Sequence, residues 1–336
     1  MRWRHVQSVK GQSPQAKSPQ DGGAALLTTL IIVAGLSAIA VSALADMRRD
    51  QRLSANAQST AQAQWFAIGA EGYARVMAED LISGALPRTA LAGPPRTGTF
   101  PLDQGVMQVA VRDASTCINA NSVVSGAGDV YQRDEAGVVQ VIALMETQGL
   151  SPSKSTELAD ALVGWIDTVG GAVGADDAAY AALAPPYLSG SEPLSEFSEL
   201  RAIRGFTSDV LAKLRPWLCV LPAVGPSRIN LNALTPEQAP ILIAMSGGKI
   251  TQTQARDLLS RRPAAGWQSL GEALSDPAIA VAAIDQRALQ ALTLDTQYLG
   301  IDVIVTHADA EAAMSGLMVR GGSGFVTVAR RWTEDR

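Results

Sequence analysis

The stretch AALLTTLIIVAGLSAIAVSALA, from Ala24 to Ala45, decides how this chain is organised. No charged residue occurs between Gly22 and Ala45, and a helix of this length can cross a bilayer core of about 30 Å. A cleaved secretory segment, which is normally shorter, and a buried core helix are the alternatives. The sequence therefore predicts a membrane span, although basic residues on both flanks only lean towards a cytoplasmic N-terminus.

The residues after the span extend the same helix. Residues 46–82 contain neither a proline nor a turn cluster, so a helix from Ala24 to about Leu81 is expected, with a length of roughly 85 to 90 Å. Small and apolar residues recur in it at intervals of three and four, which predicts one packing stripe. The stripe consists of Leu53, Ala57, Ala61, Trp65, Ile68, Gly72 and Val76.

Two stretches of alternating sequence enclose a helical one. Proline and glycine end the long helix between Ser83 and Phe100, and Gly105–Arg112 alternates as a half-buried strand does. Residues 137–290 show helical spacing, and alternation returns after about Ala291. The pattern predicts an α+β fold, in which an antiparallel sheet is interrupted by a large helical insertion domain. Expected helix caps in this domain are Ser151, Thr207 and Thr235.

Charge and composition exclude several classes of function. The 336 residues carry a formal net charge of -5, which gives no general attraction for nucleic-acid phosphates. The only histidines are His5 and His307, so neither a nucleophile–histidine pair nor a multi-histidine metal site can be built in the head. Phosphate-loop and dinucleotide motifs are absent. We expect that the protein is not an enzyme, with catalysis by carboxylates alone as the alternative.

The two cysteines, Cys117 and Cys219, lie far apart and outside the apolar span. In an oxidising compartment they can form one disulfide. The chain-entropy model predicts that it would stabilise the folded state by about 4 to 5 kcal/mol, and strain in the bond would reduce this figure. Two separate buried thiols are the alternative.

The N-terminal residues resemble those of type IV pilin-like proteins. The resemblance is carried by a polar leader ending in Gly23, the apolar AALLTTLIIVAGLSAIA and the amphipathic AQAQWFAIGAEGYAR. More narrowly, nearly the whole chain resembles the minor pseudopilin K of type II secretion systems. This resemblance implies prepilin peptidase cleavage between Gly23 and Ala24 and methylation of the new N-terminus on Ala24.

The fifth mature position also follows the K-type pattern. Most pilin-like proteins carry a glutamate there, whereas this chain has Thr28. An unpaired carboxylate in lipid is costly, so a subunit without a partner for that charge is expected to lack it. The resemblance implies a place at the tip of the filament.

The resemblance also gives the domain plan, location and partners. It implies a single-pass protein of the bacterial inner membrane with a periplasmic head, which helps initiate the pseudopilus. Its partners would be I-type and J-type minor pseudopilins, the major pseudopilin, the prepilin peptidase and the inner-membrane secretion platform. A minor pilin of a type IV pilus is the alternative. The expected parts are a leader (1–23), a transmembrane segment (24–45), a periplasmic helix (46–82), a pilin-like head (83–118 and 291–336) and the inserted domain (119–290).

An acidic cluster in LADALVGWIDTVGGAVGADDAAY is a candidate calcium site, since carboxylates on a flexible glycine-rich loop suit a hard cation. The family resemblance points to calcium as well, and we expect ligands from Asp167, Asp176 and Asp177. The chain departs from the family pattern at Val169, where a second aspartate would stand. A solvated turn with capping aspartates is the alternative.

Two further stretches, SELRAIRGFTSDVLAKLRPWLCVLP and RINLNALTPEQAPILIAMSGG with ARDLLSRR, resemble helix-hairpin-helix units. Their turn glycines, Gly205, Gly247 and Gly248, could hold a DNA phosphate on backbone amides. A membrane-anchored DNA-binding protein is thus a rival hypothesis, but basic residues do not dominate here. We expect turns that are used for packing and no nucleic-acid partner.

Overall fold

The computed structural model describes residues 19–169, 177–280, 284–322 and 324–333. The chain divides into two compact units between Ser59 and Thr60. Helix α1 (Pro19–Gly69) begins at a proline before the expected Ala24, and its residues up to Ser59 belong to the first unit. A helical stretch from Gly23 to Ser83 is long and apolar enough to cross a membrane, and its most apolar window is not buried in the protein.

The long helix continues into the second unit almost without a break. Helix α2 (Glu71–Ser83) follows α1 after the single residue Ala70, whose amide still donates to the carbonyl of Phe66 at 3.1 Å. Gly84 then ends the helix in a left-handed conformation, with φ of 78°. The predicted continuation of the helix to about Leu81 is confirmed.

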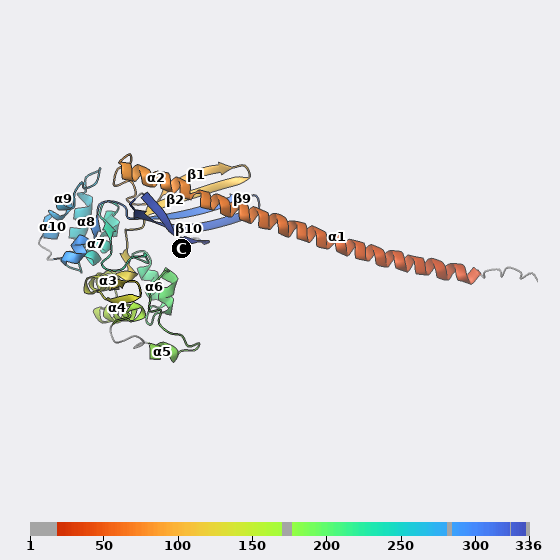
Figure 1. Ribbon diagram of the computed structural model, residues 1–336, viewed down its shortest axis with the longest axis horizontal. Helices are drawn as coiled ribbons and strands as arrows, with labels where there is room; N and C mark the ends of the chain where they lie inside the picture. The colour runs from red at the N-terminus through yellow and green to blue at the C-terminus, as the bar shows by residue number, and fades with distance from the viewer. Residues whose placement is uncertain (1–18, 170–176, 281–283, 323, 334–336) are drawn as a thin grey trace, which may run out of the picture. The chain divides into compact units, whose positions relative to one another are not determined.

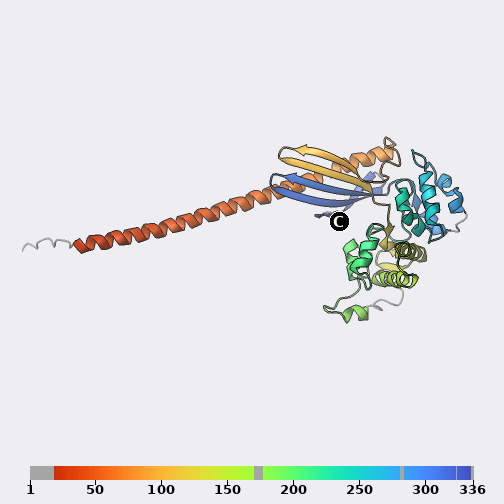
Figure 2. The same cartoon turned by 180° about the vertical axis from the view of Figure 1, so that it is seen from behind.

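The second unit contains a five-stranded antiparallel sheet with strand order β1-β2-β9-β10-β11 (Figures 1 and 2). Strand β2 lies beside β9, although most of the head separates them in the sequence. The helical insertion leaves the sheet after β2 and returns to it at β9, so the predicted α+β fold is confirmed. The strands are β1 (Arg96–Leu102), β2 (Gly105–Asp113), β9 (Tyr298–His307), β10 (Ala310–Gly321) and β11 (Gly324–Arg331).

Alanines, more than the predicted stripe, pack the helix on the sheet. Within the stripe, Trp65 and Val76 are 71% and 57% exposed, whereas Ile68 packs partly against the core of the head. Small side chains let the helix approach the strands closely, while Trp65 and Val76 remain on its outer surface. The helix residues buried in this core are Ala63, Ala67, Ala70, Ala74, Met77 and Ala78.

One charged residue is buried with these alanines. The carboxylate of Glu71 accepts hydrogen bonds from Arg330 and, at 2.9 Å, from the hydroxyl of Thr327, both on β11. Burial opposes ionisation of Glu71, but the bonds from Arg330 and Thr327 outweigh burial and lower its pKa. Glu71 therefore ties α2 to the edge strand β11.

The inserted helices share one continuous hydrophobic core. The first half of the insertion contains β3 (Ile118–Asn119), η1 (Ala120–Val123), β4 (Val124–Ala127), β5 (Val130–Arg133), α3 (Glu135–Thr147), α4 (Pro152–Ile166), α5 (Asp177–Ala181), η2 (Phe197–Ala202), α6 (Ser208–Leu214) and β6 (Leu218–Cys219). The second contains β7 (Ile229–Asn230), η3 (Pro236–Gln238), α7 (Ala239–Met245), α8 (Gln252–Ser260), α9 (Leu270–Leu274), α10 (Pro277–Ala280), α11 (Gln286–Gln290) and β8 (Leu292–Thr293).

Local signals in the sequence set these helices. Ser151 and Thr207 cap α4 and α6, and η3 begins after Thr235, as predicted. The predicted limits of the insertion were too narrow, because Ile118 pairs with Leu218 and Leu292 pairs with Ile229, all within the helical part.

Candidate functional site

The helical insertion contains the same arrangement twice. Each half begins with the sequence Ile-Asn-x-Asn, at Ile118 and at Ile229, and each first strand pairs in parallel with the last strand of its own half. The two matching helices α3 and α7 pack against each other. We call Ile118–Cys219 the first repeat and Ile229–Thr293 the second repeat.

The second asparagine of each motif makes the same hydrogen bonds. Asn121 accepts from the amide of Leu194 at 2.8 Å and donates to the carbonyls of Leu194 and Leu221 at 2.8 and 3.0 Å. Asn232 accepts from the amide of Trp267 at 2.8 Å and donates to the carbonyls of Trp267 and Leu294 at 3.0 and 3.1 Å. Both asparagines are fully buried. The repeated Ile-Asn-x-Asn was the signal that the sequence analysis missed.

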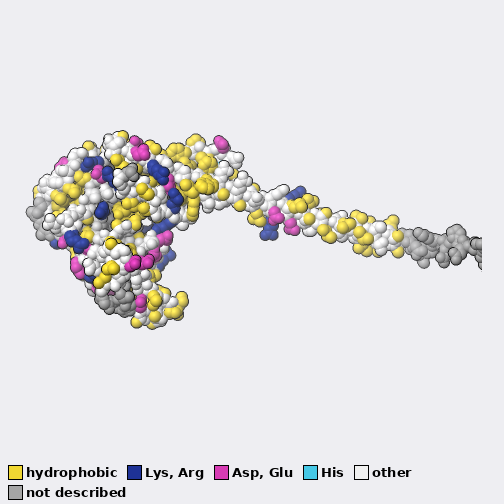
Figure 3. Space-filling view, in the orientation of Figure 1, with side chains coloured by type: hydrophobic (Ala, Val, Ile, Leu, Met, Phe, Trp, Pro, Cys, Tyr) yellow, Lys and Arg dark blue, Asp and Glu magenta, His cyan; other side chains and the backbone are white. Residues whose placement is uncertain are grey.

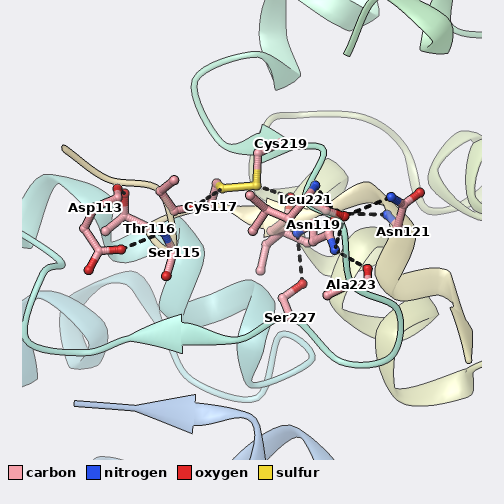
Figure 4. The surroundings of a disulfide bond; sticks show 12 residues. Asp113, Ser115, Thr116, Cys117, Asn119, Asn121, Cys219, Leu221, Ala223 and Ser227 are labelled. Atoms are coloured by element: carbon pink, nitrogen blue, oxygen red, sulfur yellow. Dashed lines mark hydrogen bonds between the residues drawn. A yellow bond between two sulfur atoms is a disulfide. The ribbon is translucent and has the colours of Figure 1, made fainter. Parts of the chain in front are cut away.

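A disulfide closes the first repeat. Cys117 and Cys219 are joined with an S–S distance of 1.97 Å and lie 5.8 Å apart at Cα. Figure 4 shows Asn119 and Asn121 beside this bond, with their amides directed at the segment that follows Cys219. The disulfide therefore fixes the same strand pair that the asparagines hold.

A cavity of about 850 Å³ lies beside the disulfide, between the sheet and the first repeat. Strand β11 contributes Val328 and Arg331 to its wall, and the first repeat contributes Leu194 and Phe197. Arg331 bonds the carbonyl of Ser195 at 2.6 Å. At the edge of the cavity, Arg331 on the sheet is therefore hydrogen-bonded to the first repeat.

The predicted processing residues lie on α1. Gly23 is exposed, and a Cβ added to it would meet no atom within 4 Å. The hydroxyl of Thr28 donates to the carbonyl of Ala25 at 2.9 Å. This bond satisfies the threonine within its own helix, so Thr28 is compatible with a lipid environment.

The predicted calcium ligands are only partly described. Asp176 lies outside the described residues, while Asp167 accepts from the amide of Val169 at 2.7 Å. Asp177 accepts from the amide and the hydroxyl of Ser189 at 2.9 and 2.7 Å, and these bonds lower its pKa. Among the described residues no group of three potential metal ligands comes together. The two described carboxyl groups are oxygen donors, whose chemistry fits calcium.

The hairpin glycines pack against the protein's own helices. A Cβ at Gly205 would lie 2.8 Å from Leu158, and one at Gly247 would lie 2.6 Å from Val139. The hydroxyl of Ser246 already accepts from the amides of Lys249 and Ile250, at 3.1 and 3.2 Å. The amides of Lys249 and Ile250 after the second hairpin are therefore already hydrogen-bonded within the protein, and Gly205 and Gly247 lie close to neighbouring helices.

The architecture defines a pilin-like subunit, with a membrane-length N-terminal helix that continues over an antiparallel sheet. Two family models described as "Type II secretion system (T2SS), protein K" match residues 116–223 and 229–295, which correspond to the two repeats. The chain belongs to this family, and it is a minor pseudopilin of the type II secretion system.

Related proteins share nearly the whole length of the chain. Type II secretion system protein K from Pectobacterium carotovorum subsp. carotovorum is 31% identical, over 92% of this chain and 96% of that protein. The Klebsiella pneumoniae protein of the same name is 30% identical, over 92% and 96%. A crystal structure of the GspK-GspI-GspJ complex from enterotoxigenic Escherichia coli contains a chain with 28% identity and a TM-score of 0.68, covering 84% of this chain and 99% of that one.

Proposed function

We propose that this minor pseudopilin occupies the tip of the periplasmic pseudopilus and helps to initiate its assembly, so that folded proteins are exported across the outer membrane. The observation that carries the proposal is the large double-repeat unit inserted between β2 and β9. Such bulk on one subunit opposes the addition of another subunit beyond it. The role is structural and needs no catalytic chemistry.

The solved relative supports the choice of partners, since it was crystallised in a complex with GspI and GspJ. We infer that I-type and J-type minor pseudopilins pack on the exposed apolar face of the long helix. Trp65, at 71% exposure, and Val76, at 57%, provide apolar area there that the head itself does not use. The major pseudopilin and the inner-membrane secretion platform would be contacted by the assembled filament.

Pull-down of the full chain by co-expressed I-type and J-type subunits tests this face. Trp65→Ala removes an exposed aromatic side chain, so complex recovery should fall at least tenfold while the melting temperature stays the same. Gln62→Ala, an exposed polar change on the same helix, is the matched control. Undiminished recovery with Trp65→Ala would place the partners elsewhere.

Processing is the second part of the proposal. A prepilin peptidase cuts between Gly23 and Ala24, Ala24 is then methylated, and the mature chain stays in the inner membrane with its head in the periplasm. The apolar helix and the exposed position of Gly23 support this. Intact-mass analysis with and without the peptidase should show a methylated N-terminus at Ala24.

A matched pair of glycine variants sharpens that test. Gly23→Val should block cleavage, whereas Gly35→Val should be processed normally. A Cβ meets no atom within 4 Å at either position, so neither substitution disturbs the packing of the protein. Cleavage near Ala45, or none at all, would overturn the processing proposal.

Calcium binding by Asp167, Asp176 and Asp177 remains a proposal supported by the donor chemistry of the two described carboxylates. Calcium should raise the melting temperature of the full chain relative to chelator, and Asp177→Asn should remove most of that shift. Glu192→Gln, at an exposed carboxylate in the same repeat, should leave it intact. An equal melting temperature with calcium and with chelator would count against the site.

A further inference from the structure

A dense group of charges follows the apolar stretch of α1. It contains Asp46, Arg48, Arg49, Asp50 and Arg52, all of them exposed. Within the described part of the chain, none of these residues forms an ion pair. Figure 3 shows the charged side chains directly after the apolar part of the helix. Their charges are thus available to something outside the protein.

The helix separates the two signs of charge. A residue turns the helix by about 100°, so Arg48, Arg49 and Arg52 fall within an arc of about 100°. Asp46 and Asp50 fall within about 40° of each other, on the other side of the helix. The segment therefore presents a basic face, which we define as Arg48, Arg49 and Arg52, and a separate acidic face.

With Ala45 at the edge of the hydrocarbon core, Arg48 and Arg49 fall within the polar headgroup layer and Arg52 falls just beyond it. Ala45 is the last residue of the apolar stretch, and the three arginines follow it by about 4 to 10 Å along the helix. The polar layer of a bilayer is about 5 to 8 Å thick on each side of the hydrocarbon core. Arginine can also extend its charged end towards this layer while its stem stays against apolar surface. The three guanidinium groups can therefore reach the phosphates.

Phosphate is the ligand that this chemistry fits best. Guanidinium groups bind phosphate oxygens through paired, charge-assisted hydrogen bonds. Arginines on the translocated side of a span also run against the usual distribution of basic residues. Lipid phosphates would offset that disadvantage, whereas a neutral surface would not.

We propose that Arg48, Arg49 and Arg52 bind the phosphates of anionic phospholipids in the leaflet next to the head. The contact fixes the depth and the rotation of the helix, and it turns Asp46 and Asp50 away from the lipid phosphates. This inference rests on the proposed membrane anchoring and adds a lipid-binding role to it.

Native mass spectrometry of the full chain in detergent tests the contact, with phosphatidylglycerol or phosphatidylcholine added. The wild type should retain phosphatidylglycerol in preference to phosphatidylcholine. Each arginine near an anionic surface is worth roughly fivefold in affinity, so the combined Arg48→Gln, Arg49→Gln and Arg52→Gln variant should bind phosphatidylglycerol on the order of 100-fold more weakly. Asp46→Asn with Asp50→Asn is the matched control and should bind at least as well as the wild type.

Three results would overturn the proposal. They are equal retention of both lipids by the wild type, undiminished retention by the triple variant, and displacement of phosphatidylglycerol by millimolar inorganic phosphate, which would indicate a general anion site. Flotation with phosphatidylcholine vesicles separates the anchor from the lipid contact, because all variants should float. Loss of flotation in the wild type would instead overturn the membrane anchoring itself.

Discussion

The two repeats share one hydrogen-bond scheme but differ in how their ends are closed. In the first repeat a disulfide joins Cys117 to Cys219. The second repeat has hydrogen bonds in place of a disulfide. Arg262 donates to the carbonyls of Leu231 and Leu234, and the side-chain amide of Asn230 donates to the carboxylate of Asp113 at 2.7 Å.

The difference follows from the length of the connections. In the first repeat 30 residues separate α4 from η2 and include the short helix α5, whereas nine residues separate α8 from α9. Ordering a longer connection costs more conformational entropy. We infer that the asparagine scheme alone is sufficient for the compact repeat, and that the extended repeat needs the covalent bond as well.

The largest expected effect tests the shared scheme. Asn121→Ala and Asn232→Ala each leave three buried backbone groups without a partner, so each should destabilise the protein by about 4 to 5 kcal/mol. Denaturant unfolding of the full chain in detergent measures the change. Asn56→Ala, at an exposed asparagine, should cost under about 0.5 kcal/mol. A large loss of stability from only one of the two asparagine substitutions would show that the hydrogen bonds of the two repeats are not equivalent.

Removal of the disulfide should affect one repeat and spare the other. Cys117→Ser with Cys219→Ser should cost about 3 to 4 kcal/mol, since the bond closes a separation of 102 residues. Hydrogen exchange should then speed up in α4 and α6 and remain slow in α8. Equal acceleration in both repeats would show that the disulfide supports the whole insertion and not the extended repeat alone.

The helix turns of the two repeats provide a smaller test. Gly149 and Gly247 both have positive φ, at 80° and 66°, but only at Gly247 would a Cβ meet a neighbour, Val139, at 2.6 Å. Gly149→Ala should cost about 1 kcal/mol and Gly247→Ala about 2 kcal/mol. Adding Val139→Ala should relieve part of the second cost and none of the first, a difference that double-mutant unfolding would reveal.

The smallest effect is a pH dependence at the contact between Asp113 on β2 and Asn230 in the second repeat. Asp113 is buried, and desolvation raises its pKa despite bonds from Asn230 and Ser115. Because the folded pKa lies above the unfolded value, the stability contribution of Asp113 is fully present below the unfolded pKa and is lost as pH rises through the folded pKa. The stability of the wild type relative to Asp113→Asn should therefore fall as the pH rises above about 4, the ordinary pKa of an aspartate in the unfolded chain. A difference that does not change with pH would mean that Asp113 titrates normally.

Local sequence patterns predicted many of the helices and strands. The apolar run from Ala24, the absence of proline to Ile82 and the caps at Ser151 and Thr207 are short-range signals, and the structure has the corresponding helices. The alternation of apolar and polar residues around Gly105–Arg112 and after Ala291 likewise corresponds to strands of the sheet.

Contacts between distant residues could not be found in this way. Glu71 is buried because Thr327 and Arg330 reach it from the far end of the chain, and no local pattern in AIGAEGYAR indicates that. The predicted helix stripe packs on the head only in part, through Ile68, because periodicity identifies a face of a helix but not which face is buried. Here the alanines face the sheet, and Trp65 stays outside.

The bond between Glu71 and β11 has a mechanical consequence. Under a pull along the long helix, alanines that only touch a sheet would resist sliding weakly. The carboxylate of Glu71 lies directly after the interruption at Ala70 and holds Arg330 and Thr327 on the edge strand. Tension that travels along α1 would therefore enter the head at this point, as shear on a charged pair, and spread from β11 across the five hydrogen-bonded strands.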